Sequence, residues 1–375
     1  MPPHPYIRSG DNIYEIETPA LVVDLNAMGA NLQTMARFTA GIPRLDWRPH
    51  AKTHKCIEIA KRQIAAGAIG ICVQKTSEAE VFSNAGIADI LVTNQVVDDR
   101  KLRRLAALAK KSRIGICCDD ADNVRQIAAA ATSENVQLDV LIEIETGAKR
   151  AGVNSANVLT GVAVAISEAR NLNFRGLQAY NGPAQHKRKA GERAEAIEYA
   201  VQHVKAAVDT LKNAGLHCET ITGGGTGTFP LEAASNIFTE IQPGSFIFMD
   251  ADYARNQETE GTIFEKFQQS LFVMTTVTSV RKDEYALVDA GHKTASVDSG
   301  MPVVDTPDGL FYARAADEYG VVEILPGASD IKPGTQLRLV PGHCDPTVNL
   351  HDWIIGYRDG IVECVWPIDA RGALL

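Results

Sequence analysis

Two short segments, far apart in the chain, carry the side chains best suited to chemistry. Residues 48–55 (RPHAKTHK) contain Lys52, and residues 342–346 (GHCDP) place His343 two positions before Asp345. A lysine amine can form a Schiff base with a carbonyl cofactor. An imidazole and a carboxylate can together hold a divalent metal. A reactive amine and a metal pair in one chain indicate an enzyme.

The neighbours of Lys52 predict a reactive amine. Adjacent cations disfavour the protonated form of an amine, so His50, His54 and Lys55 should lower the pKa of Lys52. A solvated basic loop is the alternative, and it is the commoner explanation for an isolated lysine. The strand pattern that precedes Lys52 argues against that alternative.

The second segment predicts a metal site with mixed nitrogen and oxygen ligands. One His and one Asp at this spacing do not usually form a metal site on their own. Three polar residues follow, however, and could orient the ligands: Asn349, His351 and Asp352. Such ligands suit Mn or Mg, and Zn less well. Cys344 should point away from His343 and Asp345 if the segment is extended, so we interpret it as structural.

Composition restricts the class of protein. The chain has 375 residues, of which 45% are apolar and 22% are charged, as in soluble globular proteins. A net charge of -9 argues against nucleic-acid binding. No apolar run is long enough to span a membrane, and the first residues lack a signal-peptide pattern. The seven cysteines are scattered and read as reduced core residues, which indicates a cytoplasmic protein.

Between about residues 45 and 248, β-branched runs alternate with amphipathic helical patterns. The predicted strands are 45–50, 68–74, 89–94, 113–119, 139–145, 174–180, 218–222 and 240–248. The helical patterns include 79–85, 98–110, 122–132, 158–170 and 188–214. Strict alternation predicts βαβ units with a parallel sheet, and eight units favour a closed (β/α)8 TIM-type barrel over an open sheet.

Polar residues follow the predicted strands at their carboxyl ends, where barrel enzymes build their sites. The glycine-rich loop at residues 222–228 (TGGGTGT) follows the seventh strand, and Thr228 breaks the dinucleotide pattern G-x-G-x-x-G. Barrels commonly bind phosphate with the loops after strands seven and eight. A flexible loop is the alternative. The predicted phosphate-binding residues are Thr222, Gly224, Gly225 and Thr226, with Gly244 and Ser245 in the eighth strand as companions.

Two more residues at strand ends are candidates for cofactor binding. Arg150 follows the fifth strand and could hydrogen-bond a cofactor oxygen or a substrate carboxylate. A surface arginine at a helix entry is an equally good interpretation. Tyr180 ends the sixth strand and could pack on a cofactor ring, or it could be a core aromatic residue.

After about residue 262 the pattern changes to short alternating strands joined by Gly, Pro and Asp turns. The predicted strands are 267–280, 284–289, 320–325, 336–341, 353–358 and 361–366, which together suggest a separate antiparallel β domain. A strand at residues 18–24 could pair with it. We therefore divide the chain into a barrel at 25–262 and a β domain formed by 1–24 and 263–375.

These segments together resemble the D-threonine aldolase and 3-hydroxy-D-aspartate aldolase group of the fold type III, alanine-racemase-like pyridoxal-phosphate (PLP) enzymes. The resemblance extends from residue 17 to residue 372. The matching segments are 48–52, 74–79, 150–153, 177–180, 222–227, 244–245, 248–250, 289–291 and 342–347. Taken singly, only segments 48–52 and 342–347 are specific to this group. The whole set in this order is highly specific.

The resemblance implies a role for each part of the chain. Lys52 would be the PLP lysine, the glycine-rich loop with Ser245 would hold the phosphate, and His343 with Asp345 would bind the metal. His343 is also a candidate base for the substrate hydroxyl. Related D-serine dehydratases have a cysteine where this chain has Asp345, which favours the aldolases. These aldolases commonly have a histidine at the position of Tyr319, so a role assumed for that histidine is in doubt.

The expected activity is cleavage of a D-3-hydroxy amino acid, D-threonine or 3-hydroxy-D-aspartate, to glycine and an aldehyde. A second substrate carboxylate would need a cation, for which Lys293, His292 and His186 are candidates. The alternatives are a D-serine or hydroxyaspartate dehydratase and, least favoured, a non-catalytic PLP carrier. We also expect a homodimer, in which the metal motif serves its own barrel or the partner's.

Overall fold

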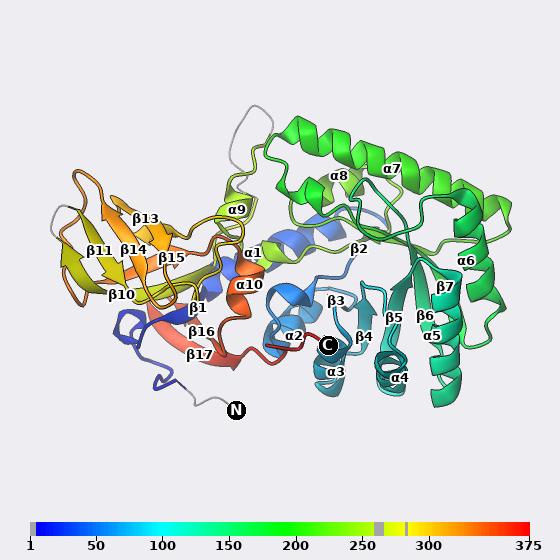
Figure 1. The fold of residues 1–375 in the computed structure, drawn as a ribbon, viewed down its shortest axis with the longest axis horizontal. Helices are drawn as coiled ribbons and strands as arrows, with labels where there is room; N and C mark the ends of the chain where they lie inside the picture. The colour runs from blue at the N-terminus through cyan, green and yellow to red at the C-terminus, as the bar shows by residue number, and fades with distance from the viewer. Residues whose placement is uncertain (1–4, 259–265, 282–283) are drawn as a thin grey trace.

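The computed structural model describes residues 5–258, 266–281 and 284–375. It contains an eight-stranded parallel sheet with surrounding helices and a second, nine-stranded sheet. The two sheets lie at opposite ends of the molecule in Figure 1. The boundary that we predicted between residues 262 and 263 lies outside the described residues.

The first sheet is the predicted (β/α)8 barrel. Its strands follow one another in chain order, and every pairing is parallel. A bridge between His50 and Cys72 and a hydrogen bond from Cys72 N to Pro49 O (2.9 Å) join the first strand to the second, which closes the barrel. The strands are β2 (Asp46–Trp47), β3 (Ile71–Val73), β4 (Asp89–Val92), β5 (Arg113–Cys118), β6 (Leu138–Glu143), β7 (Leu172–Ala179), β8 (Thr220–Gly223) and β9 (Glu240–Ile241).

Helices connect these strands and cover the outside of the barrel. They are α2 (Ile57–Ala65), α3 (Thr76–Asn84), α4 (Asp99–Leu108), α5 (Ala121–Glu134), α6 (Ala156–Glu168), α7 (Ala190–Asn213) and α8 (Phe229–Ala234). Two of them, α4 and α5, begin with an aspartate side chain, Asp98 or Asp120, that accepts backbone N–H groups. The apolar faces of these helices pack on the strands in one large core. A smaller layer from neighbouring strands fills the barrel interior: Cys72, Leu91, Cys117 and Leu141.

The second sheet is mixed, where we expected an antiparallel one. Its order is β13-β14-β11-β10-β1-β16-β17, with β12 and β15 paired beside β10. The early strand β1 pairs with β10 antiparallel and with β16 parallel, because the chain crosses the whole barrel before it returns. The strands are β1 (Ala20–Asp24), β10 (Leu271–Arg281), β11 (Tyr285–Val288), β12 (Val303–Thr306), β13 (Leu310–Ala315), β14 (Gly320–Ile324), β15 (Gln336–Val340), β16 (Trp353–Arg358) and β17 (Ile361–Pro367).

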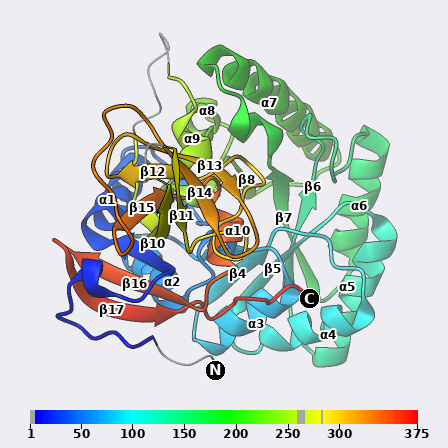
Figure 2. The ribbon, with the colours of Figure 1, turned by 60° about the vertical axis from the view of Figure 1, so that its left-hand side comes forward.

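Helix α1 (Leu25–Ala40) joins the two sheets. Its buried residues share one hydrophobic core with the start of the barrel and with the second sheet, including Met35, Trp47 and Leu339. Asn31 accepts a hydrogen bond from Gln268 N (2.7 Å) and donates to Gln268 O (2.8 Å). This shared core holds the second sheet against the carboxyl ends of the barrel strands. Figure 2 shows the short helix α10 (Cys344–Val348) between the second sheet and the barrel.

The eighth predicted strand, 240–248, is too long. The strand β9 ends at Ile241, and residues Ser245–Ile247 form a 3-10 helix. Pro243 and Gly244 end the ladder because proline has no N–H to donate and Gly244 has left the extended conformation. Ser245 and Gly244 therefore lie in the loop that leaves the barrel, beyond the strand that we placed them in.

Candidate active site

Lys52 lies in a 3-10 helix, Ala51–Thr53, directly after the first barrel strand. His50 caps this turn: its Nδ1 accepts the Lys52 N–H (3.3 Å), and its Nε2 contacts Gln74 Oε1 (3.1 Å) and Thr93 Oγ1 (3.0 Å). Residues that follow β3 and β4 thus fix the position of the His50 ring, and the ring in turn fixes the 3-10 turn that contains Lys52. The Lys52 side chain remains 41% exposed and reaches Asp345 of α10.

Lys52 forms an ion pair with Asp345, which brings the two ends of the chain together. This corrects our expectation for the amine. Burial alone would lower the pKa of Lys52, but Asp345 outweighs burial and raises it above its usual range. Burial lowers the pKa of His50 to about 3 and that of His54 to about 4, so both rings are neutral at pH 7.

The remaining cation, Lys55, points away from Lys52. Its Nζ is buried and donates to Glu78 Oε1 (2.6 Å). The basic cluster in the sequence is therefore not a cluster of charges in the folded protein, because two members are neutral and one is paired. The ion pair with Asp345 keeps Lys52 protonated. A cofactor bound to the Lys52 amine would have to replace this ion pair.

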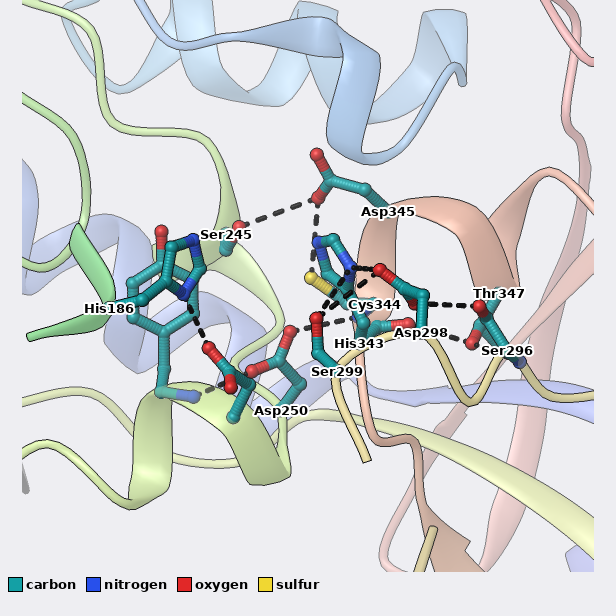
Figure 3. A network of polar contacts seen from close by, with 12 residues as sticks. His186, Ser245, Asp250, Ser296, Asp298, Ser299, His343, Cys344, Asp345 and Thr347 are labelled. Carbon is teal, nitrogen blue, oxygen red and sulfur yellow. Dashed lines mark hydrogen bonds and ion pairs between the residues drawn. The ribbon is translucent and has the colours of Figure 1, made fainter. Parts of the chain in front are cut away.

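Asp345 and His343 lie at the first turn of α10, on the side that faces the barrel. Burial would raise the pKa of Asp345, but Lys52 and His343 hold it well below its usual range, so the carboxylate is charged. His343 Nδ1 contacts Asp298 Oδ2 (2.8 Å) and lies 3.4 Å from Ser299 Oγ. Figure 3 shows His343 between Asp298 and Asp345. The imidazole therefore has Nε2 left for a metal.

The backbone around His343 is held by hydrogen bonds. Thr347 Oγ1 donates to His343 O (2.7 Å) and accepts the Ser296 N–H (3.1 Å). Asp250 Oδ2 accepts the Cys344 N–H (2.8 Å). These contacts fix the loop that carries Asp298 against the helix that carries Asp345.

The polar residues expected around the metal pair lie elsewhere. Asn349 Oδ1 accepts the Gly372 N–H (3.2 Å), His351 Nε2 contacts Thr294 O (2.8 Å), and Asp352 pairs with Arg371. Helix α10 ends at Val348, so positions 349–352 follow it. Asn349 and Asp352 secure the C-terminal segment, and His351 secures the segment at Thr294. Sequence reasoning missed Asp298 and Asp250, and only the segment 248–250 of the resemblance pointed near them.

Cys344 is fully buried, and the helix places its Sγ 3.4 Å from Asp345 Oδ1. The segment is not extended, so our reason for pointing Cys344 away from the ligands does not hold. Burial raises the pKa of this thiol well above its usual range. The thiol is thus a buried, neutral neighbour of the carboxylate, in line with a structural role.

Gly244 packs against the Lys52 turn, and the glycine-rich loop packs against residues that follow β7. A Cβ at Gly244 would lie 2.6 Å from Thr53 Oγ1, and one at Gly225 would lie 2.5 Å from Gln185 Oε1. Only glycine permits such close approach. The Gly227 N–H donates to Gln185 Oε1 (2.9 Å). The cradle is therefore preformed by backbone contacts.

The two threonines of the predicted phosphate site bind other parts of the protein through their side chains. Thr226 Oγ1 accepts the Phe246 N–H (2.9 Å), which ties the loop to the turn that contains Ser245. Thr222 Oγ1 donates to Glu240 Oε1 (2.7 Å) inside the barrel. Ser245 Oγ lies 3.4 Å from Asp345 Oδ1, as the dashed line in Figure 3 marks.

Tyr180 and Arg150 meet at the carboxyl ends of β6 and β7. The Arg150 guanidinium lies 5.7 Å from the centre of the Tyr180 ring and donates to Glu143 Oε1 (3.2 Å). Burial raises the pKa of the Tyr180 phenol. A Cβ at Gly225 would lie 3.1 Å from Tyr180 Oη, so the tyrosine borders the glycine loop.

Of the residues considered for a second carboxylate, His186 lies near the site. His186 Nδ1 contacts Asp252 Oδ2 (2.5 Å), and Asp252 also pairs with Arg188 and Arg255 (Figure 3 shows His186). Lys293, by contrast, is exposed and pairs with Glu318. The contacts that join His186 and Arg188 to Asp252 had no signal in the sequence, because the two residues lie 66 and 64 residues before Asp252 in the chain.

The residues present fit both groups that the sequence predicted. A primary amine, a glycine cradle that no Cβ could enter and a bordering phenol suit a phosphorylated aldehyde cofactor. For the metal, the charged Asp345 carboxylate and His343 Nε2 supply two donors. Within the described part of the chain, no group of three His, Cys, Asp or Glu side chains has the geometry to hold a metal. A cation there would take further ligands from substrate or solvent.

The class of protein follows from comparison with known families. The model of the alanine racemase N-terminal domain matches residues 23–252, and that of a putative serine dehydratase domain matches residues 270–357. The chain belongs to the alanine-racemase-like family. The fold that we predicted from the resemblance is confirmed.

Comparison with individual relatives is more specific than the match to the family models. The chain is 43% identical to a 3-hydroxy-D-aspartate aldolase of Paracoccus denitrificans, over 96% of this chain and 93% of the relative. It is 44% identical to a D-threonine aldolase of Arthrobacter, over 98% and 96%. The crystal structure of D-threonine aldolase from Filomicrobium marinum superposes with a TM-score of 0.95 at 42% identity, covering 98% of this chain and all of that one. The predicted resemblance to the aldolase group is confirmed.

The dehydratases are more distant. A D-threo-3-hydroxyaspartate dehydratase of Delftia is 30% identical over 90% of this chain and 93% of its own length. This order of similarity agrees with the aspartate at position 345. Separately, none of the helices in the described ranges is long and apolar enough to cross a membrane.

Proposed function

We propose that this protein is a PLP- and divalent-metal-dependent aldolase that cleaves D-3-hydroxy amino acids to glycine and an aldehyde. The observation that carries the proposal is the meeting of Lys52 and Asp345 at the barrel mouth. An amine for the cofactor and a hard metal ligand are thus in direct contact at the carboxyl ends of the barrel strands. Relatives with both aldolase activities support the proposal.

The cofactor would be held by residues of the barrel. Lys52 Nζ is the attachment point, the backbone N–H groups of Gly224 and Gly225 with Ser245 receive the phosphate, and Tyr180 borders the ring. Backbone N–H groups of such loops suit phosphate because they point outward with partial positive charge. Thr226 contributes by fixing the loop to the Ser245 turn, and Thr222 by bracing the barrel interior below it. Arg150 lies over Tyr180 and sets its orientation.

When bound, PLP accepts the electron pair of a bond broken at the substrate Cα, and a divalent cation acidifies a coordinated hydroxyl. The chain's own residues prepare both. His343 offers Nε2 because Asp298 occupies Nδ1, and Asp345 offers a carboxylate that is already ionised. We expected His343 to serve also as a base, but with both ring nitrogens engaged it would act as a ligand.

Asp345 favours the aldolase over the dehydratase. A hard carboxylate selects Mn or Mg, whereas a thiolate would select Zn. An aldolase needs the 3-hydroxyl to lose its proton and keep its oxygen, whereas a dehydratase must expel that oxygen. We further propose Mn or Mg as the metal, a homodimer as the assembly and the cytoplasm as the compartment.

Product analysis tests the proposal. The purified protein is incubated with D-threonine, D-threo-3-hydroxyaspartate and D-serine, with and without a chelator, and glycine, acetaldehyde, ammonia and pyruvate are measured. We expect glycine and acetaldehyde from D-threonine, loss of both on chelation and recovery with Mn or Mg. Pyruvate from D-serine as the main product, restored best by Zn, would establish the dehydratase instead.

A further inference from the structure

A buried carboxyl group lies directly behind the glycine-rich loop. Glu232, in α8, is 2% exposed, and a Cβ at Gly224 would lie 3.2 Å from its Cδ. A Cβ would be tightly packed against Glu232, and Gly224 has a φ of +74°, in the left-handed region that favours glycine. A group on the outer side of the loop would be separated from this carboxyl by little more than a layer of backbone.

The hydrogen bonds of Glu232 satisfy a neutral acid better than a carboxylate. Oε1 accepts from Thr228 Oγ1 (2.8 Å), and that hydroxyl accepts in turn from Gln185 Nε2 (2.7 Å). Oε2 is buried and has no hydrogen-bond partner among the described residues. A buried carboxylate with one neutral donor is costly. Burial raises the pKa of Glu232 to about 7, and the bond from Thr228 limits the increase.

No cation is paired with Glu232 within the described residues. The titratable neighbour that interacts with it is Tyr180, a phenol whose own pKa is raised, so Tyr180 stays neutral up to high pH. Lys52 and Arg150 act on Tyr180, but they pair with Asp345 and Glu143. The protonation of Glu232 is thus governed by burial, by Thr228 and by whatever charge lies in the cradle.

We propose that Glu232 is a positioning residue of the cofactor's phosphate site and that it acts as a neutral carboxylic acid held behind the cradle. This inference rests on the proposed cofactor, whose phosphate is a dianion above about pH 6–7. A neutral Glu232 leaves the partial positive charge of the loop N–H groups unopposed. An ionised Glu232 would place a negative charge behind the same groups and repel the phosphate.

The sign of the pH dependence follows. A bound dianion raises the pKa of Glu232 further, so binding is linked to proton uptake. Affinity is therefore highest below the pKa of the free protein and falls as pH rises above it, by at most about tenfold per pH unit for one linked proton. Pyridoxal, which lacks the phosphate, should not show this component. Both compounds react with the Lys52 amine, so the effect of pH on that amine cancels in the ratio of the two affinities.

The experiment measures the affinities of PLP and pyridoxal for the full-length protein, freed of cofactor, between pH 6.5 and 9.5. In the wild type we expect the PLP-to-pyridoxal affinity ratio to fall by about tenfold or more across this range. In Glu232→Gln, which keeps the shape and the Thr228 bond but cannot ionise, the ratio should be constant and equal to its low-pH value. Circular dichroism and thermal unfolding report whether the variant folds.

Two matched variants test the assignment independently of Glu232→Gln. Thr228→Val removes the one hydrogen bond to the carboxyl and should move the fall to higher pH, while Thr228→Ser should leave it in place. A wild-type ratio that does not change with pH, or a fall that persists in Glu232→Gln, overturns the inference. Failure of the wild type to bind PLP at any pH would instead overturn the proposed function.

Discussion

The two mouths of the barrel both carry many charged side chains, but they use them differently. At the amino ends of the strands, a cavity of about 620 Å³ is ringed by arginines and carboxylates. Arg48 contacts Asp89 (2.6 Å) and Glu240 (3.1 Å), and Arg113 contacts Asp139 (2.6 Å). At the carboxyl ends, the charges of Lys52 and Asp345 come from segments at opposite ends of the chain.

The difference shows that a cavity ringed by charged side chains does not by itself locate the chemistry. The amino-end ring pairs carboxylates with guanidiniums, which neither donate protons nor act as nucleophiles at neutral pH. Such a ring braces the strand ends. The carboxyl-end site combines an amine, an imidazole, a carboxylate and glycine-lined backbone, which are the groups that bind cofactors and metals. Barrels in general place stability at the first face and catalysis at the second.

The largest effect on the catalytic mouth should come from Lys52→Ala. Without the amine, activity with D-threonine should fall by about 10⁴-fold or more, and borohydride should no longer fix PLP to the protein. Lys55→Met is the matched control, since Lys55 lies three residues on and is paired with Glu78. That variant should keep the borohydride label and lose stability. A label that persists in Lys52→Ala would place the cofactor on another lysine.

At the opposite mouth, Arg48→Met should affect stability and spare catalysis. It leaves the carboxylates of Asp89 and Glu240 without their buried partner, which costs about 3–5 kcal/mol. Urea unfolding measures the loss, and activity is compared per folded molecule at low temperature. A strong fall in kcat in a protein that stays folded would show that the two mouths are coupled. That result would contradict the division of roles between them.

The residues around the metal pair allow a finer test. Asp298→Ala removes the contact to His343 Nδ1 and should weaken metal affinity by about 10–100-fold. Asn349→Ala, which we first expected to have that effect, should leave metal affinity unchanged because Asn349 binds Gly372. Titration of the chelated protein with Mn, followed by recovery of activity, distinguishes the two variants. Equal effects would argue that the sequence-based assignment of Asn349 is the better one.

The smallest expected effect is that of Arg113→Ala at the rim of the amino-end cavity. Arg113 is half exposed, and exposed ion pairs contribute only about 0–1 kcal/mol. Thermal unfolding should therefore move by a few degrees at most, and activity should not change. A loss of stability as large as that of Arg48→Met would mean that the ring acts as one network. In such a network, the exposure of an ion pair does not determine its contribution to stability.

The sequence by itself determined the architecture and the reactive residue types. The alternation of strands and helices predicted the barrel because burial on both faces of a parallel strand demands continuous apolar runs. Lys52 and the pair of His343 and Asp345 stand out because few residue types can do their chemistry. Local turn chemistry also placed the glycine-rich loop after the seventh strand.

Tertiary structure decided what those residues do to one another. Lys55 and Lys52 are neighbours in the sequence, yet one is buried on Glu78 and the other faces Asp345. Nothing local reveals that Asp298 supports His343, or that Glu232 lies behind Gly224 with its Oε2 unpartnered among the described residues. Such contacts depend on how separate segments pack. The charge state of a group follows from its burial and its partners in space, and neither can be read from neighbours along the chain.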